Sequence, residues 1–107
     1  MSLVERDVVF AALADANRRL LLDRLGARNG QTLSQLCTGI PISRQAITKH
    51  LRLLEAANLV LSRRQGRNKL HYLNPVPIHA TALRWLKQFD ALTLEAFAVA
   101  PGSGDTE

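Results

Sequence analysis

The sequence is short of cysteine and it has no long apolar run. Its 107 residues include a single cysteine, Cys37, so no disulfide forms within the chain. No apolar stretch resembles a secretion signal or a membrane span, and charged residues begin at Glu5. These absences predict a cytoplasmic protein that does not interact with membranes.

The signatures of catalysis and of cofactor binding are missing as well. The sequence has no glycine-rich loop that would cradle phosphates, no cluster of metal-ligand residues, and no credible set of nucleophile, base and acid. We therefore expect no catalytic residue, no metal site and no cofactor, and we do not predict an enzyme.

Acidic residues are almost absent from the segment 42–72. The only anion there is Glu55, against seven cations, so this segment has a net charge of +6 in a chain whose net charge is +5. A concentrated basic field attracts polyanions such as nucleic acids or anionic membranes. Five of the seven cations are arginine, whose planar guanidinium suits phosphates and guanine edges. The composition of the segment therefore indicates binding to nucleic acid rather than to an anionic membrane.

What is present is a hydrophobic periodicity typical of a mainly α-helical domain with one small β-hairpin. Asp15, Thr32 and Ser43 are residue types that cap helix N-termini, and each precedes a predicted helix. We expect one domain over residues 1–98 and a disordered polar tail over 99–107. The predicted helices are 4–13, 16–25, 33–37, 44–57 and 78–98, and the predicted strands are 59–64 and 69–73.

The predicted helix 16–25 has an apolar side and a charged side. Leucines supply the apolar side, and we expect the charged side to face solvent. The charged residues are Arg18, Arg19, Asp23 and Arg24.

The order of helix 33–37, turn 38–42 and helix 44–57 is typical of a DNA-reading pair of helices. The major groove of B-DNA admits one α-helix, whose first residues reach the base edges. Duplex RNA has a narrow major groove that excludes such a helix, and the five aromatic residues leave few for stacking on single strands. The DNA contacts predicted for the second helix are Ser43, Arg44, Gln45, Thr48, Lys49 and Arg52.

The predicted hairpin places further cations around its turn. Such a ribbon lies along the DNA backbone or enters the minor groove, where arginine is favoured. The alternative is that these charges only prevent edge-to-edge association of strands. The DNA contacts predicted for the hairpin are Arg63, Arg64, Gln65, Arg67 and Lys69.

The pattern Ser-x-x-x-Ile-x-x-His-Leu-x-x-Leu from Ser43 to Leu54 strongly resembles the ArsR/SmtB family of bacterial winged helix-turn-helix repressors. The segments 12–19 and 64–73 resemble the same family. The resemblance implies a homodimer that binds double-stranded promoter DNA, usually as a repressor at an inverted repeat. It also implies that His50 lies at or near the DNA.

The resemblance further implies that the first and last helices pack against their mates in a dimer. Both predicted helices have surplus apolar faces, which gives such a dimer a physical basis. The alternative is that both stripes lie in the core of a single chain. The predicted interface residues are Val4, Val8, Val9, Ala82, Trp85, Leu86, Phe89, Leu92 and Phe97.

The chain departs from the metal-sensing members of this family. Their Cys-x-Cys pair corresponds to Thr32 and Ser34, and a lone Cys37 cannot chelate a soft metal. His79 and Asp90 are about three helical turns apart, so one helix cannot bring both to a single ion. A metal- or redox-responsive sensor, and a winged helix that binds only proteins, stay as alternatives. The sequence identifies no effector.

Overall fold

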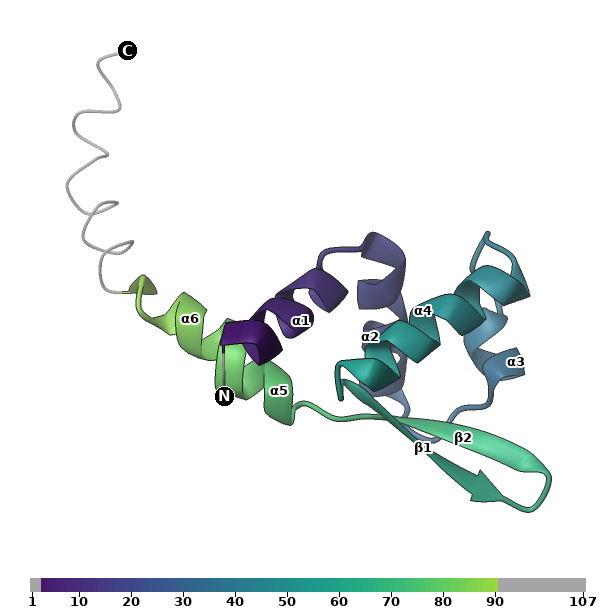
Figure 1. The fold of residues 1–107 in the computed structure, drawn as a ribbon. Coiled ribbons are helices and arrows are strands. Elements are labelled where there is room, and N and C mark those ends of the chain that lie inside the picture. Colours follow the sequence, from purple (N-terminus) through teal and green to yellow (C-terminus); the bar gives the residue numbers. More distant parts are fainter. Residues whose placement is uncertain (1–2, 91–107) are drawn as a thin grey trace, which may run out of the picture.

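The computed structural model describes residues 3–90, and within them the chain is mainly helical with one antiparallel hairpin. Figure 1 shows α1 beside the last helices at one end and the hairpin beneath α3 and α4 at the other. The predicted fold class is confirmed. The elements are α1 (Leu3–Leu13), α2 (Ala16–Ala27), α3 (Leu33–Cys37), α4 (Arg44–Ala56), β1 (Val60–Gln65), β2 (Asn68–Leu73), α5 (Val76–Ile78), the π-helix η1 (His79–Leu83) and α6 (Arg84–Lys87).

The three predicted N-caps are confirmed by their hydrogen bonds. Asp15 Oδ1 accepts from the amides of the first turn of α2. Thr32 forms a reciprocal capping box with Gln35, and Ser43 Oγ accepts from the Ala46 amide at 3.1 Å. Each cap satisfies an amide that has no partner within its helix, and so defines where α2, α3 and α4 begin.

One contiguous core is formed by α1 to α4 and the first residue of β1. Its largest fully buried side chains include Leu21 and Leu25 of α2, Leu36 of α3 and Ile47 of α4. Val9 of α1 belongs to the same core and is only 1% exposed. Our assignment of Val9 to the dimer interface is therefore corrected, because its own chain already covers it.

A Schellman motif ends α4 and directs the chain into β1. Asn58 adopts the left-handed conformation with φ of 61°, which asparagine tolerates better than most residues. Its amide donates to the Glu55 carbonyl at 3.0 Å, and the Leu59 amide donates to the Leu54 carbonyl at 2.9 Å. The motif fixes the direction in which the hairpin leaves α4.

The predicted helices differ from the structure mainly at two places, beyond shifts of one or two residues at other helix ends. Helix α2 continues to Ala27, because Gln31 Nε2 donates to the carbonyls of Arg24 and Arg28 at its end. The long last helix is divided by η1, where Thr81 Oγ1 donates to the Pro77 carbonyl at 2.6 Å. In a regular α-helix, this carbonyl would accept a hydrogen bond from the backbone amide four residues later in the chain. The predicted interface residues Leu92 and Phe97 and the predicted tail 99–107 lie outside the described residues.

Candidate nucleic-acid interface

The turn between α3 and α4 is held by an arginine from α2. Arg24 Nη1 donates to the Leu36 carbonyl at 3.3 Å and also to the Thr38 carbonyl, at the end of α3. Gly39 in this turn has φ of 76°, and a Cβ there would lie 3.4 Å from Arg24 Nη2. The expectation that Arg24 faces solvent is therefore wrong. Its guanidinium instead fixes α3 and the turn that presents α4.

The polar face of α4 is a shallow depression of about 400 Å³. It lies opposite the buried Ile47, Leu51 and Leu54, so the core fixes which side of α4 is presented. The Arg44 guanidinium donates to Ser34 Oγ at 3.2 Å, and Thr48 Oγ1 donates to the Arg44 carbonyl at 2.9 Å. Among the described residues, no carboxylate lines this depression. Its lining residues are Arg44, Gln45, Thr48, Lys49 and Arg52.

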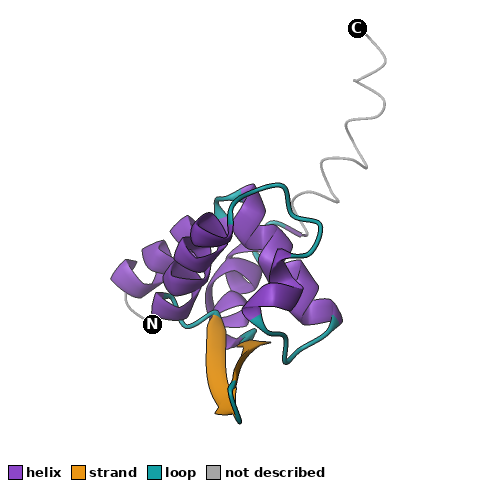
Figure 2. Cartoon of the chain, turned by 90° about the vertical axis from the view of Figure 1, so that its right-hand side faces the viewer, coloured by secondary structure: helices purple, strands orange, loops and turns teal. Residues whose placement is uncertain are grey.

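The hairpin projects beyond the helices as a two-stranded ribbon (Figure 2). Gln65 pairs with Asn68 across a two-residue turn, and Gly66 at the first turn position has the positive φ of 64° that such a turn requires. The Arg63 guanidinium lies 6.0 Å from the centre of the Tyr72 ring. The five hairpin residues predicted to contact DNA are all exposed.

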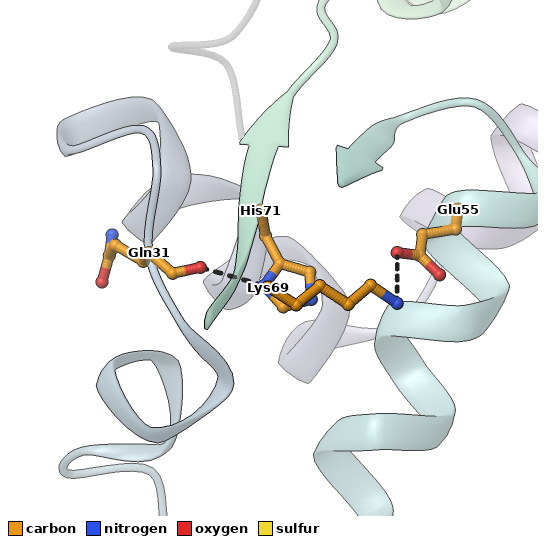
Figure 3. A network of polar contacts seen from close by, with 4 residues as sticks. All are labelled: Gln31, Glu55, Lys69 and His71. Carbon is orange, nitrogen blue, oxygen red and sulfur yellow. Dashed lines mark hydrogen bonds and ion pairs between the residues drawn. The ribbon is translucent and has the colours of Figure 1, made fainter. Parts of the chain in front are cut away.

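A cleft of about 340 Å³ separates the hairpin from α3 and α4. Arg44 and Arg52 line it from α4, and Arg67 and Lys69 line it from the hairpin. Its carboxylate is Glu55, whose Oε2 lies 3.6 Å from Lys69 Nζ (Figure 3). This ion pair bridges α4 and β2, so part of the charge of Lys69 is balanced by the chain itself.

The base of the hairpin is anchored to the loop after α2. His71 is buried, and both its amide and its Nδ1 donate to the Gln31 carbonyl, at 2.8 and 2.9 Å (Figure 3). The amides of Gly30 and Gln31 donate in return to the His71 carbonyl. These bonds occupy the backbone groups and Nδ1 of His71, which agrees with the structural role that its place in a strand suggests.

His50 is separated from the other predicted contact residues of α4. It is half-buried, and its Nδ1 lies 3.3 Å from Nη1 of Arg18 in α2. Helical spacing turns residue 50 well away from Arg44, Thr48 and Arg52. The expectation that Arg18 faces solvent is also wrong. Sequence reasoning missed Arg18 and Arg24 because a charged helix stripe looks the same whether it faces water or the carbonyls of neighbouring helices.

Asp15 belongs to the same junction of α1, α2 and α4. The Arg18 amide that donates to Asp15 Oδ1 holds the pKa of this carboxyl below its ordinary value of 3.8, and the Asn17 amide adds to the effect. The nearby charge of Arg18 acts in the same direction. The capping carboxylate is thereby kept ionised.

The apolar side of α1 and α6 is exposed in the single chain. Val4 is 72% and Leu86 is 53% exposed, and Val8, Trp85 and Phe89 are exposed as well. Trp85 makes edge-to-face contacts with Phe10 and Phe89, with ring centres 5.8 and 5.1 Å apart. Ala82 is half-buried beside them. We call these residues the apolar face of α1 and α6, and most of it is left exposed by the described residues.

Within residues 3–90, no three His, Cys, Asp or Glu side chains are grouped as ligands of one metal ion would be. Cys37 is a free thiol, partly buried against the core. In the same range, no helix has the length and apolarity needed to cross a membrane.

Comparison with known proteins gives related sequences over most of the chain. A profile described as a helix-turn-helix domain matches residues 13–63. The chain is 40% identical over 88 residues to YuzN of Bacillus subtilis, an uncharacterised HTH-type transcriptional regulator. That match covers 77% of this chain and 96% of YuzN.

Solved structures share the fold as well. An ArsR-like transcriptional regulator from Rhodococcus sp. RHA1 superposes with a TM-score of 0.71 at 35% identity, covering 92% of each chain. The homodimeric winged helix-turn-helix domain of Mb0332 from Mycobacterium bovis has a TM-score of 0.66 at 23% identity, covering 84% of this chain and 83% of that one. The chain belongs to the ArsR family of winged helix-turn-helix proteins and is a DNA-binding transcriptional regulator.

Proposed function

We propose that this regulator binds double-stranded operator DNA as a homodimer, with α4 of each protomer in the major groove. The observation that carries the proposal is the polar face of α4, which presents cations and amide or hydroxyl groups without a carboxylate. Arginine pairs with guanine and glutamine with adenine at base edges, so Arg44 and Gln45 in the first turn are the proposed base-reading residues. Thr48, Lys49 and Arg52 are proposed to contact bases or phosphates one and two turns on.

The hairpin is proposed to hold the DNA beside the reading helix. Arg64 and Arg67 are exposed near its tip, and the buried His71 anchors its base, so the tip is presented from a fixed support. Cations on such a ribbon bind backbone phosphates or the narrow minor groove. Ser43 is proposed to lie near a phosphate through the N-terminus of α4, because its hydroxyl already caps that helix.

The dimer is proposed to form through the apolar face of α1 and α6. The exposed Val4, Val8, Trp85, Leu86 and Phe89 lie together there, and burying them against a second copy removes apolar surface from water. The similar Mb0332 domain is described as homodimeric. A two-fold dimer places its reading helices about 34–36 Å apart, on an inverted repeat.

Repression is the proposed outcome of binding. A dimer that occupies major grooves at a promoter blocks other proteins sterically, and this requires no additional activity. The proposed site of action is the cytoplasm, where bacterial promoters lie.

The test is a titration of the purified protein with the duplex upstream of its own gene and with a scrambled duplex, at several salt concentrations. We expect tighter binding to the upstream duplex and an affinity that falls steeply with salt. Replacing Arg44 and Lys49 by alanine together is expected to lower the affinity at least about tenfold and to reduce the salt slope by about one, through the lost phosphate contact of Lys49.

The matched control is Arg28→Ala, which removes an exposed arginine outside the α4 face. It is expected to leave the affinity within about twofold of the parent protein. Unchanged binding by the double variant would refute α4 as the reading helix. Absence of binding to either duplex at low salt would favour a winged helix that binds proteins only.

A further inference from the structure

The side chain of Arg18 connects three helices. Arg18 lies in α2, and its Nε donates to the Ala12 carbonyl at 2.8 Å while its Nη2 donates to the Ala11 carbonyl at 3.0 Å. Both carbonyls belong to the last turn of α1, where helix carbonyls have no amide partner in regular α-helical register. The third nitrogen, Nη1, lies 3.3 Å from His50 Nδ1 in α4.

The chemistry of the guanidinium determines which group donates and which accepts in the contact between Arg18 and His50. A guanidinium only donates hydrogen bonds, so His50 Nδ1 is the acceptor of this contact. The capping bond that the Arg18 amide donates to Asp15 Oδ1, 3.1 Å long, fixes the backbone from which the guanidinium extends. The planar guanidinium holds its donors at fixed angles, so α1 and α4 are both bound to one rigid group.

Packing alone connects α1 and α4 less directly. Helix α1 packs on α2 and η1, and α4 packs on α2, α3 and β1. Both helices contribute to the same core, and the guanidinium of Arg18 adds a polar connection between the carbonyl end of α1 and the reading helix. His50 is the residue of α4 that receives it, on a side turned away from the proposed DNA face.

We propose that Arg18 and His50 form a joint that fixes the reading helix relative to α1. The consequence for DNA rests on the proposed function: because α1 carries part of the dimer face, the joint sets the separation of the two α4 helices. Arg18 and His50 are then positioning residues that determine which half-site spacing the dimer accepts. His50 acts on DNA through α4, and its ring contacts Arg18.

The first test measures the distance between α1 and α4 without DNA. Spin labels are attached at Asp7→Cys and Lys49→Cys, both exposed sites, in a Cys37→Ser background. Labelled protein is diluted with unlabelled protein, so that only distances within one chain are measured. We expect a narrow distance distribution in the parent and a broadened or shifted one in Arg18→Lys and His50→Leu.

The matched control for this test is His50→Asn. The asparagine Oδ1 takes the place of Nδ1 as acceptor, so we expect the narrow distribution to be retained. Far-ultraviolet circular dichroism and the unfolding midpoint confirm that each variant is folded. A distribution in His50→Leu as narrow as in the parent, and at the same distance, would overturn the joint.

The second test measures the consequence for DNA. The parent protein selects a duplex from a random pool, and the variants are titrated with this duplex and with a copy in which one half-site is scrambled. We expect His50→Leu to lose about tenfold in affinity for the intact repeat. We expect its affinity for the single half-site to stay within about twofold.

The two tests separate failure of the joint from failure of the proposed function. If the parent selects no inverted repeat, the proposed dimeric DNA reading fails, while the distance measurement still decides the joint. Equal losses on the intact repeat and on the single half-site would overturn a role in spacing, because they would indicate damage to the reading face itself.

Discussion

Asn58 is a residue whose backbone conformation is required by the fold. It has φ of 61° at the point where α4 turns into β1. Valine is β-branched and disfavours this conformation, so we expect Asn58→Val to lower the free energy of unfolding by about 1–2 kcal/mol. Urea denaturation measures the change. Asn58→Gly is the control, and a loss of stability as large as that of valine would show that the side chain and not the backbone matters.

Glu55 is a residue that opposes the charge of the proposed DNA surface. Its Oε2 is buried without a hydrogen bond and lies 3.6 Å from Lys69 Nζ. Replacing Glu55 by glutamine releases Lys69 to bind a phosphate. We therefore expect tighter DNA binding, with a slope of log affinity against log salt steeper by about 0.9.

The control for Glu55→Gln is Asp23→Asn, which makes the same change of charge on an exposed part of α2 outside the cleft. It is expected to leave the slope unchanged. A weaker affinity of the Glu55→Gln protein would contradict this prediction and would show that the ion pair mainly holds the hairpin in place.

Residue types and spacing were sufficient to predict the cationic face of α4 but not every partner of its residues. Arg44, Gln45 and Lys49 follow from helical periodicity, because the buried leucines fix the opposite side. The contact of His50 with Arg18 joins residues 32 positions apart. A periodic pattern within one helix does not indicate which residue of another helix lies beside it. For the same reason, the apolar pattern of α1 did not distinguish Val9, which packs inside its own chain, from the residues of the dimer interface.

At the scale of the element, the N-cap of α2 predicts a dependence of stability on pH. Asp15 has a pKa below its ordinary value of 3.8 in the folded protein. Its ionised form therefore stabilises the fold at pH values above the unfolded pKa, and this contribution is lost as the pH falls through the lower, folded pKa. Asparagine also caps helices but does not titrate there.

The measurement compares thermal midpoints of the parent and Asp15→Asn proteins between pH 7 and about pH 2. We expect the advantage of the parent to shrink below the unfolded pKa. A difference between the two proteins that does not change over this range would contradict the assigned role of the carboxylate.

The helices and strands were predictable where local signals coincide. Capping residues, apolar periodicity and the glycine turn at Gly66 agree for α2 to β2, and the structure follows them closely. The division of the last helix by η1 was not predicted. At η1 the Thr81 hydroxyl donates to the Pro77 carbonyl and competes with a backbone amide for it. This competition does not change the spacing of apolar residues, so the sequence pattern does not reveal it.

At the scale of the whole molecule, the exposed apolar face predicts that one substitution dissociates the dimer. Leu86 is 53% exposed on α6. A glutamate there would place an unpaired charge in the proposed interface, so we expect Leu86→Glu to sediment as a monomer and to bind the operator weakly.

Analytical ultracentrifugation measures this association. Leu53→Glu is the control, because Leu53 is also an exposed apolar residue but lies on α4, outside the apolar face of α1 and α6. It is expected to leave the sedimentation coefficient unchanged. A parent protein that is itself monomeric at micromolar concentration would contradict the proposed dimer.

The anchoring of the hairpin at Gln31 and His71 has a consequence for how such proteins diversify. The buried residues lie at the base of the ribbon, whereas residues 61–69 are all exposed. Most side chains near the tip can therefore change with little cost to folding. A regulator built in this way changes its grip on the DNA backbone through substitutions at the tip, while α4 continues to read the bases. Grafting a tip from one relative to another would transfer that grip while the helical scaffold keeps its stability.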